Sequence, residues 1–247
     1  MERKDFLKKG FIAALGISAI APLAASCKKE DVSAGSSSGS SGSTGSGSTG
    51  TTGSCSTSPT ETEGPFPTKS PSSLVTNNIT SDRAGVPFTV KITINNRNNS
   101  CGALAGAIVD IWHCDKDGNY SEYGGTGMQA SNYTSVHFLR GRQTTDAAGL
   151  VTFTSVFPGW YSGRAPHIHV HVYNASGTSL LVTQIAFPTD VCNTVYTTAT
   201  NYYTKGKQDT SNAADNVFSD SLASELATVT GSVSAGYTLT HIVTVAA

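Results

Sequence analysis

The chain has 247 residues, of which only 13% are charged, and a formal net charge of −1. It carries no basic stripe, so the composition argues against nucleic acid as a partner. About 190 residues follow the N-terminal segments described next, which is enough for one domain with a hydrophobic core.

Residues 1–27 are predicted to be an export signal. Basic residues come first, an apolar run over residues 10–23 follows, and small residues precede Cys27. The run is shorter than the ~20 residues that span a membrane. Leu23-Ala-Ala-Ser-Cys27 resembles a bacterial lipobox, and Arg3-Lys4-Asp5-Phe6-Leu7-Lys8 resembles a twin-arginine export signal. We therefore expect an exported lipoprotein on the periplasmic or cell-surface side of a bacterial membrane, anchored at Cys27; a cleaved signal with an incidental cysteine is the alternative.

A linker over residues 28–58 is predicted next. It is dominated by Gly, Ser and Thr, which cannot bury enough apolar area to fold. A flexible chain of this length reaches roughly 25–30 Å, so it would hold a domain just clear of a membrane surface. The folded domain is expected to cover residues 59–247.

Strand signals dominate that domain. Apolar alternation and β-branched residues indicate strands over residues 88–94, 107–112, 150–154, 167–172, 180–187 and 237–245, with turn residues between them. Only residues 220–228 offer much helix signal. The pattern predicts an all-β fold, a β-sandwich of mainly antiparallel strands with long active-site loops and little helix.

Four cysteines remain besides Cys27. Cys55, Cys101, Cys114 and Cys192 are an even number in an exported chain, which allows two disulfides in three pairings, and we expect at least one pair to form. A zinc site with four thiolates is the alternative, which the absence of any C-x-x-C spacing disfavours.

Two tyrosines and two histidines form the candidate metal site. His167 and His169 are two apart on a predicted strand, so they share one face with backbones about 6.5–7 Å apart. Tyr161 follows a Pro-Gly turn that can bring it back toward this strand, and Tyr120 follows an Asp-Gly turn. Each group alone has an ordinary interpretation, as a packed aromatic, a solvent-facing histidine or a zinc ligand. Together they suit a hard, oxidised, redox-active metal, with Fe(III) as the first candidate, because phenolates are hard anionic donors.

The surrounding stretches resemble the intradiol ring-cleavage dioxygenases. Thr62-Glu63-Gly64-Pro65-Phe66 resembles the opening motif of that family, and Asp110-Ile-Trp-His-Cys-Asp-x-x-Gly-x-Tyr120-Ser resembles its first tyrosine motif. Phe138-Leu-Arg-Gly141-x-Gln143-x-Thr-Asp146-x-x-Gly149 and Pro158-Gly-Trp-Tyr161-x-Gly-Arg164-x-x-His167-Ile-His169 resemble the rest, in order, up to about Phe187. Within the family the chain looks most like the exported, single-domain members, akin to catechol and protocatechuate dioxygenases.

This resemblance implies a site and a reaction. It implies that Tyr120, Tyr161, His167 and His169 bind non-haem Fe(III), and that Arg164 and Gln184 line the site near the substrate. Tyr161 is then the ligand that leaves the metal and takes a substrate proton. The implied reaction is cleavage of a catechol-type aromatic by O2, between its two hydroxyls, to a cis,cis-muconate.

Two alternatives from other classes stay open at this point. One is a tethered β-sandwich lipoprotein that binds a ligand without catalysis. The other is a zinc or copper storage protein that uses the histidine strand and the cysteines. Pocket residues are expected from the loops 124–136 and 193–205, and His171, outside the family motif, is expected to pack or to form the pocket edge.

Overall fold

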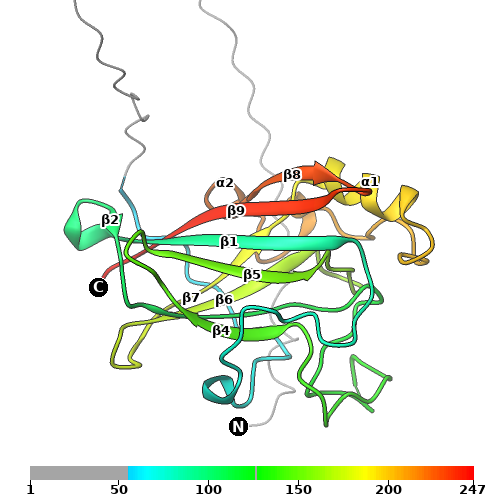
Figure 1. The fold of residues 1–247 in the computed structure, drawn as a ribbon. Coiled ribbons are helices and arrows are strands. Elements are labelled where there is room, and N and C mark those ends of the chain that lie inside the picture. Colours follow the sequence, from blue (N-terminus) through cyan, green and yellow to red (C-terminus); the bar gives the residue numbers. More distant parts are fainter. Residues whose placement is uncertain (1–54, 126) are drawn as a thin grey trace, which may run out of the picture. The chain divides into compact units, whose positions relative to one another are not determined.

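The computed structural model describes residues 55–125 and 127–247 (Figure 1). The predicted export signal over residues 1–27, its Cys27 and the predicted linker up to residue 54 lie outside the described residues. Within the described part of the chain, no helix combines the length and the apolar character needed to cross a lipid bilayer.

The first of two sheets is built around the long strand β1 (Pro87–Asn96). This strand pairs antiparallel with β2 (Gly102–Ala103) and β5 (Leu150–Val156), and parallel with β9 (Gly236–Val245). The antiparallel strand β8 (Thr228–Ser232) extends the sheet beyond β9. The pairing of β1 with β9 joins the beginning and the end of the domain.

The second sheet lies below the first in Figure 1 and is antiparallel throughout. Its strands follow the order β4 (Arg140–Thr144), β3 (Ile108–Trp112), β6 (His167–Tyr173) and β7 (Ser179–Ala186). A short connection joins β6 and β7 into a hairpin, whereas long loops precede β4 and β6. These long loops lie at the end of the sheet where β6 begins, which is the end that carries His167.

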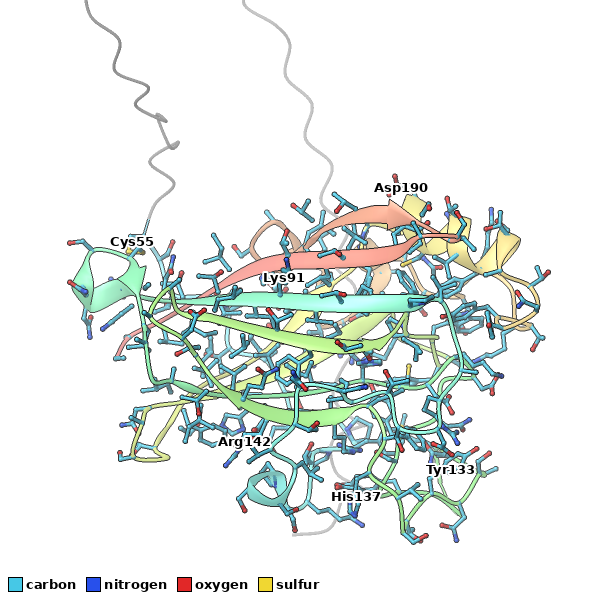
Figure 2. All side chains as sticks on the ribbon, in the orientation of Figure 1. Cys55, Lys91, Tyr133, His137, Arg142 and Asp190 are labelled. Atoms are coloured by element: carbon cyan, nitrogen blue, oxygen red, sulfur yellow. A yellow bond between two sulfur atoms is a disulfide. The ribbon has the colours of Figure 1, made fainter. Side chains whose placement is uncertain are left out.

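The core between the sheets confirms the predicted sandwich. Val90 and Ile92 of β1 face Ile168 and Val170 of β6 in one buried apolar cluster. The intervening residue Lys91 is exposed (Figure 2). Because side chains alternate along a strand, the odd-numbered residues of β6, including both predicted histidine ligands, point to the opposite face of the second sheet.

The six predicted strands correspond to β1, β3, β5, β6, β7 and β9. Within residues 220–228 a single helical turn forms, α2 (Leu222–Glu225), before the chain enters β8. The helix α1 (Thr189–Thr198) was not predicted. Its residues are rich in Thr and Val, which have low helix propensity, and it is held by three buried side chains packed on the main core: Cys192, Val195 and Tyr196.

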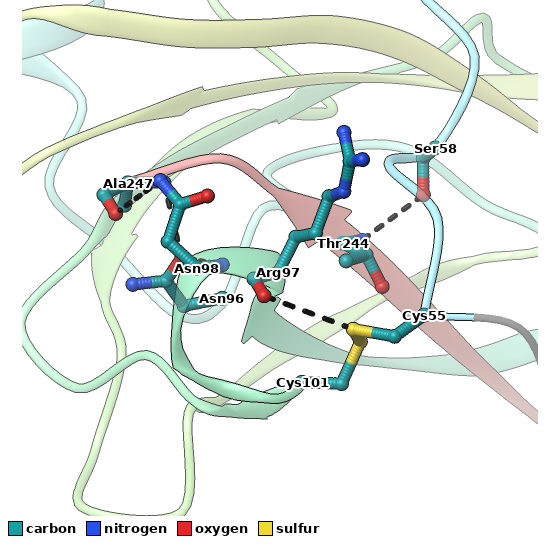
Figure 3. Close-up of a disulfide and its surroundings, with 8 residues drawn as sticks. All are labelled: Cys55, Ser58, Asn96, Arg97, Asn98, Cys101, Thr244 and Ala247. Atoms are coloured by element: carbon teal, nitrogen blue, oxygen red, sulfur yellow. Dashed lines mark hydrogen bonds between the residues drawn. A yellow bond between two sulfur atoms is a disulfide. The ribbon is translucent and has the colours of Figure 1, made fainter. Parts of the chain in front are cut away.

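One disulfide forms within the described residues, between Cys55 and Cys101 (Figure 3). The expectation of at least one pair is confirmed, and the other two cysteines, Cys114 and Cys192, are free and buried. Cys114 packs in a cluster beside the predicted metal site, whereas Cys192 packs in the main core. Next to the disulfide, Ser58 exchanges two hydrogen bonds with Thr244 of β9, which fastens the start of the described chain to the first sheet.

Candidate metal centre

The two predicted histidine ligands lie side by side at the start of β6. His167 and His169 are both almost fully buried. Trp112 of β3 is the register partner of His169, and its ring stacks on the imidazole at a centroid distance of 4.8 Å and an interplanar angle of 3°. This stacking fixes the plane of His169, so the direction of its Nε2 is set by the sheet.

Both tyrosines come to the same point from separate loops. The Tyr120 Oη lies 3.2 Å from His167 Nε2, which in turn lies 3.2 Å from His169 Nε2. The ring of Tyr161 is centred 5.9 Å from that of Tyr120 and 5.6 Å from that of His167. The structure therefore brings together all four side chains that the residue pattern singles out.

These separations suit shared coordination of one ion. Nitrogen ligands lie about 2.1 Å from a bound first-row ion such as zinc, so two ligands are about 3.0 Å apart at a right angle and about 3.4 Å apart at a tetrahedral angle. The observed 3.2 Å falls between these values. No group of three or more His, Cys, Asp or Glu placed for a metal occurs in the described residues. A metal here would therefore depend on the phenols, and the donor set of the storage alternative is not formed in this part of the chain.

Hydrogen bonding fixes the tautomer of His167 and presents a nitrogen lone pair to the centre of the site. His167 Nδ1 lies 2.6 Å from the carbonyl of Ala165 and must donate to it, so Nε2 carries the lone pair. His169 Nδ1 is buried and has no hydrogen-bond partner among the described residues. If His169 is protonated on Nδ1, a buried donor stays unpaired and two Nε2 lone pairs face each other. If it is protonated on Nε2, its buried Nδ1 acceptor stays unpaired. A cation bound between the two Nε2 atoms would accept the lone pairs of both imidazoles, which suits a metal site, while His169 Nδ1 has no partner among the described residues in either tautomer.

Burial controls the protonation of these groups. It raises the pKa of Tyr120 well above the ordinary value and that of Tyr161 to about 12, where the nearby Arg164 guanidinium acts in the opposite direction. Burial lowers the pKa of His167 to about 3, and burial together with His167 lowers that of His169 far below the ordinary value. Without a cation all four groups are neutral; a bound cation favours the phenolates by direct attraction.

A strap formed by residues 55–68 covers the site. The Glu61 amide donates to Val182 O of β7, and the Gln184 side chain donates to Thr62 O at 2.9 Å. Gly64 then passes the edge of His169, and Phe66 stacks on Tyr120 at 4.8 Å. The opening motif of the domain is thus a wall of the site, although it lies more than fifty residues from Tyr120 in sequence.

Arg140 is a buried residue of the site that was not predicted. From β4 it donates to Phe66 O, to Ser121 Oγ and to Ser121 O, at 2.9, 2.9 and 2.7 Å. It therefore ties the strap to the residue that follows Tyr120. The available signal was a lone cation within the apolar start of the third family-like stretch, Phe138-Leu-Arg140.

Of the two residues expected near the substrate, Arg164 lines the cavity described below, whereas Gln184 is fully buried and is not among its lining residues. Arg164 donates from Nη2 to Gln184 Oε1 at 2.7 Å, and from Nε to both carboxylate oxygens of Asp215. Gln184 is the register partner of His169 on β7, so it connects the guanidinium to the histidine strand. Asp215, buried in the loop after α1, had no distinguishing sequence signal.

A cavity of about 490 Å³ opens beside these groups. Its lining includes Thr62, Pro65, Met128, Tyr161, Arg164 and Val217. Among the described residues that line it, Met128 comes from the predicted loop 124–136, and none comes from 193–205; the segment around Val217 takes that place. His171 lies further along β6, hydrogen-bonded to Ser179 and Tyr173 and 3.2 Å from Glu63 of the strap.

Known proteins share this sequence pattern and fold. The family described as Dioxygenase matches residues 62–219, more than half of the chain. A chlorocatechol 1,2-dioxygenase from Rhodococcus opacus is 28% identical over 120 residues, which are 41% of this chain and 44% of that protein. The chain thus matches less than half the length of this curated relative.

Two solved structures resemble this one over most of both chains. An intradiol ring-cleavage dioxygenase from Tetranychus urticae has a TM-score of 0.67 and 28% identity, covering 78% of this chain and 95% of its own. The dioxygenase domain of a dioxygenase carbohydrate-binding protein fusion from Streptomyces sp. SirexAA-E has a TM-score of 0.54 and 26% identity, covering 77% and 99%.

Proposed function

Since this chain belongs to the intradiol ring-cleavage dioxygenase family, we propose that it uses O2 to cleave a catechol-type aromatic between its two hydroxyl-bearing carbons. The product would be a cis,cis-muconate-type dicarboxylate. The proposed cofactor is non-haem Fe(III), held by Tyr120, Tyr161, His167 and His169.

One observation carries this proposal. In a buried cluster, the Tyr120 Oη lies 3.2 Å from His167 Nε2, which lies 3.2 Å from His169 Nε2. Tyr161 approaches this cluster from the side of the cavity. Two phenols beside two imidazoles are not needed by a protein that only binds a ligand. Phenolates are hard, anionic oxygen donors, which suits a ferric rather than a ferrous ion.

The two tyrosines differ in access to the cavity, and this difference assigns their roles. Bound Fe(III) would supply a Lewis acid that draws electron density from the catechol ring. Tyr161 lines the cavity and is only half-buried, so its Oη, ionised as the phenolate that a bound cation favours, would take a proton from an entering catechol hydroxyl. Tyr120 is fully buried, its ring stacks on Phe66 and the Arg140 guanidinium carbon lies 5.9 Å from its ring centroid, so we propose that it stays in place.

Arg164 supplies positive charge at the cavity wall. A catechol that loses its protons carries negative charge on its oxygens, and a fixed guanidinium stabilises this charge most strongly where water is excluded. Pro65, Met128 and Val217 form an apolar part of the lining. A cavity of about 490 Å³ lies within the range of sites for drug-sized ligands, so we propose that it admits ring-substituted catechols as well as catechol.

We also propose that the protein is exported and anchored through a lipid on Cys27. The Cys55–Cys101 disulfide supports an oxidising compartment, because such bonds are rare in the reducing cytosol.

The proposed function is tested by oxygen uptake of the iron-loaded full chain with a panel of substituted catechols. We expect a red-brown protein, consumption of O2 and the ultraviolet spectrum of a muconate. Yellow semialdehyde products would contradict cleavage between the hydroxyls. A protein that binds iron but stays colourless would refute tyrosine ligation. Catechol binding without any O2 consumption would favour the ligand-binding alternative.

A further inference from the structure

The buried carboxylate of Asp215 connects to both the substrate side and the metal side of the site. The side chain is fully buried at the end of the short 3-10 helix η3 (Asn212–Ala214). Its oxygens accept from Arg164 Nε at 3.1 and 2.9 Å, from the Ala165 amide at 2.7 Å and from the Val217 amide at 2.9 Å. The ion pair with Asp215 avoids an unpaired buried charge, which would be costly, while the Arg164 guanidinium still lines the cavity.

The first arm of this arrangement sets the direction of Arg164. The guanidinium is planar and is held at two places, at Nε by Asp215 and at Nη2 by Gln184 Oε1. Two fixed points define the plane of the group. The orientation of the guanidinium toward the cavity and Tyr161 is therefore determined by its two partners and not by Arg164 itself.

The second arm reaches His167 through one residue. Asp215 accepts the amide hydrogen of Ala165, and the carbonyl of the same Ala165 accepts the Nδ1 hydrogen of His167 at 2.6 Å. The carbonyl holds His167 in the tautomer that presents the Nε2 lone pair. A displacement of Ala165 would therefore turn the imidazole.

We propose that Asp215 is a positioning residue that orients Arg164 toward the bound substrate and, through Ala165, orients His167 toward the metal. This inference rests on the proposed function, since it names what holds two groups of that site. Buried partners that orient metal ligands and charged site residues typically contribute about 10–100-fold to metal affinity or activity.

The test compares Asp215→Asn with Asp215→Ala in the iron-loaded full chain. Asparagine can still accept from the Ala165 amide, but it loses the negative charge and one acceptor. We expect Asp215→Asn to keep the iron content and the visible band, and to lower kcat about 10–100-fold, with a smaller change in KM. Asp215→Ala should weaken Fe(III) binding as well, measured by iron titration of the visible band.

Asp209→Asn is the matched control. Asp209 is exposed and accepts from Ser162 Oγ and the Gly163 amide, so it holds the same turn without a hydrogen bond to Arg164. We expect its kcat to stay within about twofold of the native value. A loss equal to that of Asp215→Asn would show that tethering of the turn, rather than orientation of Arg164, is responsible, and would overturn the proposal.

A double-mutant cycle with Arg164→Ala isolates the first arm. If Asp215 acts through Arg164, Asp215→Asn should lower kcat far less in the Arg164→Ala background than in the native one. Equal losses in both backgrounds would overturn this arm. A native chain that consumes no O2 would instead defeat the proposed function. In that case a crystal structure of Asp215→Asn decides the inference: Arg164 Nη2 should leave Gln184 Oε1, and an unmoved guanidinium would contradict it.

Discussion

Gly64 offers the most direct test of how the strap shapes the metal site. Its backbone has φ +68°, and a Cβ added there would lie 2.9 Å from Cε1 and 3.4 Å from Nε2 of His169. Non-bonded carbon atoms normally lie about 3.5 Å or more apart, so Gly64→Ala requires the imidazole or the strap to move by about 0.6 Å. The imidazole is stacked on Trp112 and the strap on Tyr120, so either movement disturbs a group of the site.

Two separate effects are expected from Gly64→Ala. The left-handed backbone costs a residue with a Cβ about 1–2 kcal/mol, which lowers the free energy of unfolding. The displaced imidazole lowers turnover, and since a misplacement of about 1 Å can cost about 100-fold, we expect a loss of at least about tenfold. Urea denaturation measures the first effect; oxygen uptake and iron titration of the visible band measure the second.

Gly106→Ala separates the two effects. Gly106 has φ +77°, and none of the described atoms lies within 4 Å of a Cβ built there. It should therefore lose a similar free energy of unfolding while keeping iron affinity and turnover. If Gly64→Ala shows the same loss of stability as Gly106→Ala but binds iron and turns over like the native chain, the strap does not press on His169 and the reasoning is wrong.

Three further predictions concern other parts of the molecule. Tyr120→Phe should abolish the visible band and oxygen uptake together; survival of both would exclude it as a ligand. Replacing Cys55 and Cys101 with serine removes a disulfide between residues 46 apart in sequence. This should lower the free energy of unfolding by about 4 kcal/mol in urea denaturation; an unchanged value would mean that the disulfide does not stabilise the fold. Burial lowers the pKa of His113 in the folded chain to about 4. As the pH falls, the unfolded chain therefore protonates His113 before the folded chain does. The free energy of unfolding should fall by about 3 kcal/mol as the pH drops from about 6.5 to 4. In His113→Gln this loss should shrink; an identical pH dependence would assign it to other groups.

Strands with a clean alternation were predictable because their period is a local property. Along β1 and β6 every second residue is apolar, and burial between two sheets requires that pattern. The strand β4 was missed because its residues, Arg140 to Thr144, are polar and rely on long-range partners. Helix α1 was missed for a related reason, since its Thr-rich sequence is a poor helix former that tertiary packing stabilises.

The cysteines show the limit of spacing as a guide. An even count allowed two disulfides and could not choose the pairing, because a bond requires two Cα atoms within about 7 Å. Cys55 and Cys101 meet this condition at 5.8 Å, because the strap runs back along the first sheet. Cys114 and Cys192 are assigned to different apolar clusters, and burial raises the pKa of both thiols far above the ordinary value.

The residue pattern by itself determined the chemical nature of this protein. It placed two imidazoles on one strand face, supplied two phenols after turns, and specified a sandwich, because each of these follows from periods of a few residues. Only the tertiary structure decided which atoms meet. Asp215 reaches Arg164 across 51 residues and Arg140 reaches the strap across 74, and no local pattern records such a distance. Partners far apart in the chain are selected by how the two sheets and their loops pack, and that packing also excludes water and thereby sets the protonation of the site.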